Sequence, residues 1–262
     1  MSAPVAVITG AARGIGAACA VLGARAGWQL VLVDACADDP NIAYHLATAG
    51  DLEATVAACG DGTVSLLGDV RDQGAMDAAV ALAVERFGGV DIAVAVAGVV
   101  GGGPNSWETP DGLWSAVLDV NLLGVHRLAH AAVPALLARP QPRQGRFVAV
   151  ASASSSVGLP RLSAYAAAKH GVVGYVRSLA AELGPEGITA NAVAPGSTRT
   201  EGLSASAALY GLDSPEELAV HHLDPRLLDP SEVAEAVVWL CSPAASGVTG
   251  AVLAVDAGFT AR

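Results

Sequence analysis

Basic residues, aromatic residues and cysteines are all scarce in this sequence of 262 residues. Lys and Arg number 14 against 25 Asp and Glu, and the formal net charge is −11. This balance argues against a nucleic-acid-binding protein, because such proteins need a basic surface to meet phosphates. Aromatic residues make up 4% of the chain and hydrophobic residues 53%, so a substantial core must be built from Ala, Val and Leu.

The cysteines exclude two further classes of protein. Cys19, Cys36, Cys59 and Cys241 are scattered, with no Cys-x-x-Cys pair and no histidine at ligand spacing, so neither a metal site nor a disulfide framework is predicted. Free thiols in a reducing compartment are expected instead. No uninterrupted apolar segment reaches the ~18 residues of a membrane span, and the N-terminus has no basic region or cleavage site. A cytoplasmic protein is therefore expected.

Among 14 basic residues only one is a lysine, and it lies four residues after a tyrosine. Tyr165 and Lys169 belong to an Ala-rich run that predicts a helix, on which residues four apart share a face. A free phenol has a pKa of about 10, and a neighbouring cation lowers that pKa toward the range useful for proton transfer. This pair alone also fits a surface helix with a solvated lysine.

Short apolar runs rich in β-branched residues alternate with helical patterns along the whole chain. The expected strands are residues 5–9, 29–33, 63–67, 90–96, 147–151, 188–193 and 251–255. The first expected helix follows the glycine-rich run and ends near residue 26. The others are 51–59, 72–87, 110–138, the Tyr165/Lys169 run to 183, and 230–241. This alternation predicts an α/β fold: residues 1–262 form a single doubly wound Rossmann-type domain, with a parallel sheet of about seven strands and helices on both faces.

Two features predict where a nucleotide binds. The run Gly10-Ala-Ala-Arg13-Gly14-Ile15-Gly16 joins the first strand to a helix, an arrangement that presents backbone N–H groups to a phosphate, although turns also use glycine. Asp34 ends the second strand, where a carboxylate accepts hydrogen bonds from both ribose hydroxyls. The carboxylate also repels a 2′-phosphate, with an energy of ~4 kcal/mol per unit charge at a separation of ~4 Å and an effective dielectric constant of ~20. NAD is therefore favoured over NADP, and a solvated strand-end aspartate is the alternative.

Further candidates also fall at the ends of predicted strands. In doubly wound sheets, ligands bind beyond the C-terminal ends of the strands. The residues at these ends are Gly10, Asp34, Asp69, Gly98, Ser152 and Pro195. Their coincidence predicts one shared site.

These residues resemble the short-chain dehydrogenase/reductase family over essentially the whole chain. The matching motifs are Thr9-Gly10-x-x-x-Gly14-x-Gly16, Asp69-Val70, Asn121, Ser152 with Tyr165-x-x-x-Lys169, and Pro195-Gly196 followed by Thr200. The resemblance implies that Tyr165 is the general acid/base and that Ser152 binds the substrate oxygen. It implies that Lys169 binds the nicotinamide ribose and lowers the pKa of Tyr165. Asn121 would hold a water that passes the proton to solvent.

The same resemblance implies an NAD site. Its residues would be Gly10, Arg13, Gly14, Ile15, Gly16, Asp34, Asp69, Val70, Ala97, Gly98, Tyr165, Lys169, Pro195, Gly196, Thr198 and Thr200, with the two threonines beside the carboxamide. Only the family spacing separates Ser152 from its neighbours Ser154, Ser155 and Ser156. The sequence has Val96 where the family usually has Asn, which predicts the loss of a polar contact that stabilises the end of that strand.

A narrower resemblance is to the mycofactocin-associated members of this family. It rests on Asp34-Ala-Cys36 and the insertion after it, Tyr44-His-Leu-Ala-Thr48, Asp51-Leu-x-x-Thr-Val56, Pro195-Gly-Ser-Thr-Arg-Thr200 and Ala208-Leu-Tyr-Gly-Leu-Asp213. That group is similar to nicotinoproteins, in which NAD stays bound and another carrier re-oxidises it in place. The insertion at 35–50 would then fold over the adenosine half of NAD. A decorative surface loop is the alternative, because long loops cost little stability.

The sequence thus predicts an NAD-dependent oxidoreductase that transfers a hydride between nicotinamide and a secondary alcohol or ketone. NAD is either retained and recycled by mycofactocin or exchanges freely, and a nucleotide sensor without catalysis is a further alternative. Apolar residues within 201–228, among them Leu203, Leu209 and Tyr210, suggest a lid over the substrate. The small apolar residues of the 110–138 and Tyr165/Lys169 helices, with the family resemblance, predict a homotetramer built on two-fold axes.

Overall fold

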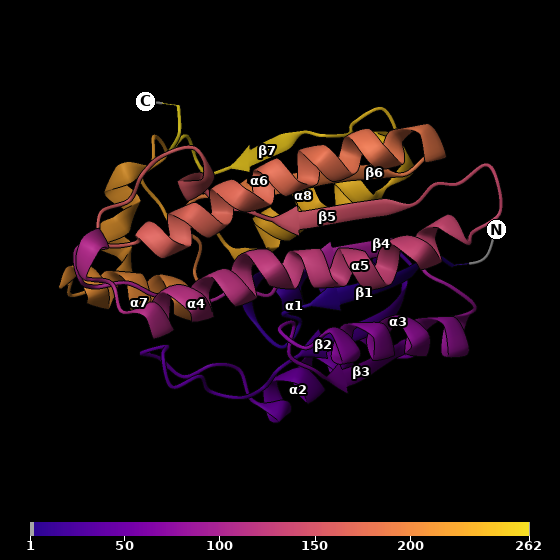
Figure 1. Ribbon diagram of the computed structural model, residues 1–262, viewed down its shortest axis with the longest axis horizontal. Helices are drawn as coiled ribbons and strands as arrows, with labels where there is room; N and C mark the ends of the chain where they lie inside the picture. The colour runs from indigo at the N-terminus through magenta and orange to yellow at the C-terminus, as the bar shows by residue number, and fades with distance from the viewer. Residues whose placement is uncertain (1–2, 262) are drawn as a thin grey trace.

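The structure is a computed structural model that describes residues 3–261. Within these residues one parallel sheet of seven strands forms the middle layer (Figure 1). In spatial order the strands are β3 (Thr63–Leu67), β2 (Gln29–Asp34), β1 (Val5–Thr9), β4 (Ile92–Ala95), β5 (Arg146–Val150), β6 (Thr189–Pro195) and β7 (Val252–Val255). After β3 the chain crosses to the other half of the sheet and places β4 beside β1. This reversal of strand order confirms the predicted doubly wound fold.

Helices cover both faces of the sheet. The helices are α1 (Gly14–Arg25), α2 (Ala49–Cys59), α3 (Gln73–Phe87), α4 (Asp111–Leu118), α5 (Gly124–Leu137), α6 (Ser163–Leu183), α7 (Glu201–Tyr210) and α8 (Pro230–Cys241). Residues of α3, α5 and α6 form the core on one face, and residues of α1, α2 and α8 form the core on the other. Along β1, Val7 faces the first core and Ile8 the second, and neither side chain is exposed. A strand buried on both faces reads as a continuous apolar run, which is why the sequence revealed it.

The helix expected at 110–138 is not one regular helix. The structure divides it into α4, a π-helical turn at Asp119–Leu123, and α5. The widened turn contains Asn121, whose side-chain amide donates to the backbone oxygens of Val117 at 2.8 Å and of Val99 at 2.9 Å. Such turns inside helices are frequent at functional sites, and periodicity does not reveal them.

The segment 201–228, for which no strand was predicted, contains α7 and a 3₁₀ turn at Pro215–His221. The turn begins with a capping box formed by Ser214 and Glu217. Figure 1 shows α7 at the left, beyond the arrowheads of the strands. The predicted lid therefore lies at the C-terminal end of the sheet, where the predicted site residues also lie.

Candidate active site

A cavity of about 930 Å³ lies beyond the C-terminal ends of the strands, next to α7. It is lined by the predicted catalytic residues Asn121, Ser152, Tyr165 and Lys169. It is also lined by the rest of the predicted cofactor set: Gly10, Arg13, Gly14, Ile15, Gly16, Asp34, Asp69, Val70, Ala97, Gly98, Pro195, Gly196, Thr198 and Thr200. The fold thus brings every predicted site residue to one cavity, and the role of each stays a prediction.

The glycine loop has the close approaches that a phosphate-binding turn needs. Gly10 has φ of +67°, and a Cβ on it would lie 2.6 Å from the backbone nitrogen of Ala97. A Cβ on Gly16 would lie 1.9 Å from the backbone oxygen of Gly10, so only glycine fits there. Arg13, the N-cap residue of α1, makes no side-chain cap hydrogen bond. The first turn of α1 thus keeps backbone N–H groups available for an anionic ligand, which fits a dinucleotide.

Asp34 is held firmly at the rim of the same cavity. One carboxylate oxygen accepts from the backbone N–H of Ala12 at 3.0 Å, and the other accepts from that of Cys36 at 3.2 Å. These bonds leave further lone pairs on both oxygens. The position and the remaining acceptor capacity fit the predicted contact with ribose hydroxyls.

The segment 35–48, here called the strap, is tied to three strand ends. The guanidinium of Arg13 donates to the backbone oxygen of His45 at 2.8 Å, so this predicted cofactor residue also holds the strap to the glycine loop. Arg71, after β3, forms an ion pair with Asp39 of the strap. The hydroxyl of Tyr44 accepts from the backbone N–H of Val100, after β4, at 3.1 Å. These contacts extend the strap from the β2 side of the cavity to the β4 side, and its role in cofactor binding stays a prediction.

Asp39 and Asp69 flank the guanidinium of Arg71. Asp69 pairs with it at 2.6 Å, and the side chain of Asp39 is 7% exposed. Burial raises the pKa of Asp39, but hydrogen bonds from Asn41 and Arg71 outweigh it and hold that pKa below its ordinary value. Both carboxylates are therefore charged at neutral pH, and Arg71 bridges them.

Tyr165 and Lys169 lie on the first turns of α6, where the ammonium nitrogen of Lys169 is 5.6 Å from the centroid of the Tyr165 ring. That ammonium donates to the backbone oxygen of Val150 at 2.8 Å. Burial raises the pKa of Tyr165 to about 12, although a hydrogen bond with Ser152 acts against this. Burial also lowers the pKa of Lys169 to about 8. Lys169 is not among the causes of this shift, so the expected lowering of the Tyr165 pKa by the cation stays a prediction.

The serine cluster after β5 separates into distinct roles. Ser155 donates its hydroxyl to the backbone oxygen of Ser152, and Ser156 donates its hydroxyl to that of Ala153 at 3.2 Å. The hydroxyl of Ser154 is buried and has no hydrogen-bond partner among residues 3–261. Within this cluster, Ser152 is the residue whose side chain acts to lower the pKa of Tyr165. This effect agrees with the family spacing, and the role of Ser152 stays a prediction.

Asn121 turns an acceptor toward Lys169. The amide nitrogen of Asn121 donates to the backbone oxygens of Val99 and Val117. Its Oδ1 is buried without a hydrogen-bond partner in the described part of the chain. A Cβ on Gly98 would lie 2.8 Å from this oxygen and 3.6 Å from the Lys169 nitrogen. Both polar groups therefore adjoin the same small space, which fits the predicted proton relay.

The end of β4 keeps a polar contact despite Val96. The hydroxyl of Thr9 on β1 accepts from the backbone N–H of Val96 at 3.3 Å and from that of Ala97 at 3.5 Å. Val96 has no polar side chain to make the contact expected of an Asn, but the Thr9 hydroxyl still holds the two backbone N–H groups at this strand end.

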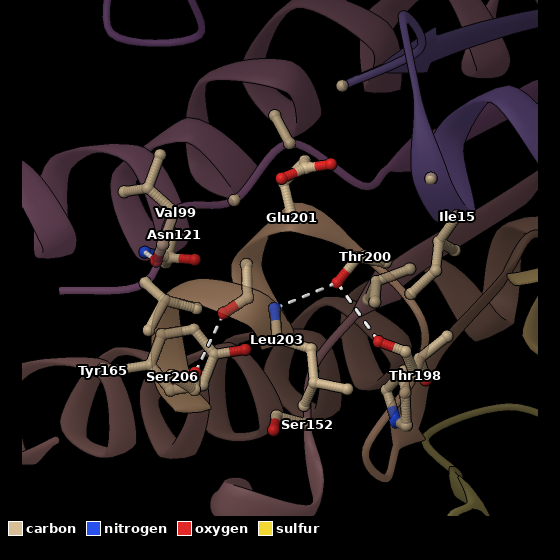
Figure 2. A pocket seen from close by; sticks show the side chains of 18 of the residues that line it. Ile15, Val99, Asn121, Ser152, Tyr165, Thr198, Thr200, Glu201, Leu203 and Ser206 are labelled. Carbon is tan, nitrogen blue, oxygen red and sulfur yellow. Dashed lines mark hydrogen bonds between the residues drawn. The ribbon is translucent and has the colours of Figure 1, made fainter. Parts of the chain in front are cut away.

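Thr198 and Thr200 connect the cavity to the lid. Thr200 accepts from the backbone N–H of Leu203 at 3.3 Å and thereby caps α7, while its hydroxyl donates to the backbone oxygen of Thr198 at 3.3 Å. Figure 2 shows Thr198 and Ile15 on one side of the pocket, with Tyr165 and Asn121 opposite. At the other end of α7, Tyr210 donates to the backbone oxygen of Pro160 at 2.7 Å. The lid is therefore fixed at both ends of α7.

Some cavity residues were not among the predicted site residues. They are Tyr44, Arg71 and Glu201, together with the apolar Leu159, Leu162, Leu218 and Phe259. Arg71 directly follows the Asp69-Val70 motif, which is a signal that could have found it. Tyr44 was noted only as part of a family pattern. The contacts of both come from packing of the strap, which local sequence does not specify.

Comparisons with known proteins agree on one relationship. A family model described as enoyl-(acyl carrier protein) reductase matches residues 10–260. A (−)-trans-carveol dehydrogenase of Rhodococcus erythropolis is 37% identical over 98% of this chain and 98% of its own. A cyclohexanol dehydrogenase of Acinetobacter sp. (strain SE19) is 34% identical over 98% of this chain and 95% of its own. The crystal structure of carveol dehydrogenase from Mycobacterium avium in complex with NAD has a TM-score of 0.94 at 35% identity, covering 100% of this chain and 99% of that one.

Proposed function

The chain belongs to the short-chain dehydrogenase/reductase family, and we propose that it is an NAD-dependent dehydrogenase of secondary alicyclic alcohols. The observation that carries this proposal is the convergence of Ser152, Tyr165, Lys169 and Asn121 on the cavity that also contains the glycine loop and Asp34. The named activities of the similar carveol and cyclohexanol dehydrogenases support the substrate class. A nucleotide sensor would need only the cofactor half of this cavity.

In the proposed reaction Tyr165 exchanges a proton with the substrate oxygen, which also receives a hydrogen bond from Ser152. Bound NAD⁺ supplies the hydride acceptor, and its positive charge favours the phenolate. Lys169, with its pKa lowered to about 8, can give up a proton more readily than an exposed lysine. Its nitrogen and the unpaired Asn121 oxygen form the route by which the proton leaves toward solvent.

The dehydrogenase proposal is tested by following reduced nicotinamide spectroscopically. Purified protein is incubated with NAD and a panel of secondary alicyclic alcohols that includes carveol and cyclohexanol. Reduction of nicotinamide by at least one of them is expected. If the whole panel fails while NAD binds, the sensor alternative is favoured instead.

We further propose that the strap retains NAD and that mycofactocin re-oxidises it in place. Support comes from the three anchors of the strap and from the side chain of Asp39, which is 7% exposed. A cofactor beneath such a segment dissociates only after the anchors open. An ordinary dehydrogenase with freely exchanging NAD is the alternative, and it requires no closed strap.

Asp34 is expected to exclude NADP. The charge of a 2′-phosphate would meet a carboxylate fixed by Ala12 and Cys36, and the repulsion corresponds to at least ~100-fold weaker binding. Calorimetric titration of nucleotide-free protein with each cofactor measures this ratio, and Asp34→Asn should reduce it. The exposed strap residue Asp38 offers a control, since Asp38→Asn should leave the ratio unchanged. Equal affinity of the wild-type protein for both cofactors would remove Asp34 from the site.

We propose that the chain forms a homotetramer through α5 and α6. By length and composition alone, the helical run Asp111–Leu137 is apolar enough to cross a membrane. Only 39% of its most apolar 18-residue stretch is buried within the chain, so much of this apolar surface is left uncovered. It packs against α3 and the sheet on one side, and pairing with a second copy would cover exposed apolar side chains such as Leu123, which is 39% exposed. Light scattering at micromolar concentration is expected to give a tetramer, and a monomer contradicts the proposal.

A further inference from the structure

Tyr44 brings the strap to the catalytic groups. Its ring packs with Ile42, Val99 and Ala164 in a small apolar cluster that also includes the ring of Tyr165. Tyr44 and Tyr165 line the same cavity. Figure 1 shows the strap as the indigo loop at lower left, running from the end of β2 toward α4 and α7. The strap thus extends beyond Asp34 and the glycine loop to the catalytic end of the cavity.

The Tyr44 hydroxyl stabilises the loop that orients Asn121. It accepts from the backbone N–H of Val100 at 3.1 Å. The preceding residue, Val99, accepts from the side-chain amide of Asn121 at 2.9 Å. One hydroxyl on the strap therefore fixes a dipeptide whose other polar contact holds a predicted catalytic side chain.

The lid meets the strap at the same point. A Cβ on Gly202 of α7 would lie 3.4 Å from a methyl carbon of Val100 and 3.8 Å from the Tyr44 hydroxyl. Strap, loop and lid therefore contact one another around Tyr44. Within the described residues, the Tyr44 hydroxyl is hydrogen-bonded to the loop and not to α7.

We propose that Tyr44 is a positioning residue of the dehydrogenase reaction. Its hydroxyl holds Val99 and Val100, and through them Asn121, while its ring packs against the same apolar cluster as the ring of Tyr165. The strap would then serve the chemical step as well as cofactor binding. This inference rests on the proposed dehydrogenase function.

Two substitutions separate the hydroxyl from the ring. Tyr44→Phe keeps the ring and removes one hydrogen bond, which should slow the chemical step about tenfold. Tyr44→Ala also removes the ring from the apolar cluster that Tyr165 shares and should slow the chemical step further. His45→Ala is the matched control: this neighbouring side chain is 96% exposed, its ring contacts Asp38 within the strap, and the substitution leaves the backbone oxygen that anchors the strap in place. It should react at the wild-type rate.

The measurement is the single-turnover rate of nicotinamide reduction at saturating NAD, recorded against alcohol concentration. For Tyr44→Phe the limiting rate should fall while the half-saturating alcohol concentration stays within about twofold of wild type. A limiting rate equal to that of wild type in Tyr44→Phe and Tyr44→Ala would overturn the inference, as would variants that lose bound NAD but react normally once NAD is saturating. Failure of the proposed function is distinguishable, because the wild-type protein itself would then reduce no nicotinamide.

Discussion

Tyr165→Phe is expected to lower the rate of alcohol oxidation by about 10²–10⁴-fold, the range supplied by a general acid/base, while NAD binding stays near the wild-type value. The phenol exchanges the substrate proton but is one of many groups around the cavity, so its loss removes proton transfer and little binding. The rate of nicotinamide reduction and the dissociation constant for NAD are measured on the same preparation.

A second tyrosine on α6 provides the control for this prediction. Tyr175 is not among the residues that line the cavity, and its ring centroid is 5.6 Å from that of His126 on α5. Tyr175→Phe should therefore oxidise the alcohol at the wild-type rate. If Tyr165→Phe kept even about a tenth of the wild-type rate, a loss far below that range, Tyr165 would not be the acid/base.

Arg71→Ala is expected to convert a retained cofactor into an exchanging one. The variant loses the ion pair that joins the strap to the end of β3 and leaves Asp39 without its guanidinium partner. A hydrogen bond to a charged group contributes about 1.5–3 kcal/mol, so NAD should dissociate roughly ten- to a hundredfold faster. After extensive dialysis, wild-type protein should release near one NAD(H) per chain on denaturation, and the variant much less.

A double-mutant cycle assigns this effect to the ion pair itself. Asp39→Ala removes only the strap pair, whereas Arg71→Ala also removes the pair with Asp69. Asp39→Ala should therefore speed the loss of NAD as well, and the double variant should lose NAD no faster than Arg71→Ala alone. Arg143→Ala removes a different ion pair, with Glu186, and should leave retention unchanged. If Arg71→Ala retained NAD as wild type does, the strap would not control cofactor release.

The sequence predicted the features that depend on local pattern. Strand ends were predicted well because buried strands such as Val5–Thr9 are apolar on both faces. The candidate catalytic residues were named from spacing typical of the family; the fold brings them to one cavity, and their roles stay predictions. Arg13 was assigned to the cofactor alone, but its contact with His45 depends on a fold formed 32 residues further along the chain. The raised pKa of Tyr165 could not be predicted either. It depends on how completely the strap and α6 exclude water, which a spacing of four residues does not encode.

The strap, on which several of the proposals depend, has no clear sequence periodicity. Three polar contacts, with Arg13, Arg71 and Val100, hold the strap in place. The strap has no periodic apolar face that would reveal this position in the sequence. Such contacts join residues far apart in sequence, so each end looks like an ordinary surface charge or a loop residue until the fold is known. Tyr44 is such a residue: its hydrogen bond with Val100 joins positions 56 residues apart, so the sequence gives it no role.

The most direct test adds a secondary alicyclic alcohol to extensively dialysed protein with no added nucleotide and records the absorbance of reduced nicotinamide. If NAD is retained and re-oxidised in place, reduction should stop near one equivalent per chain. It should resume through many turnovers when an artificial electron acceptor is supplied. Protein that shows no reduction until NAD is added, and then cycles rapidly with free NAD alone, would contradict it.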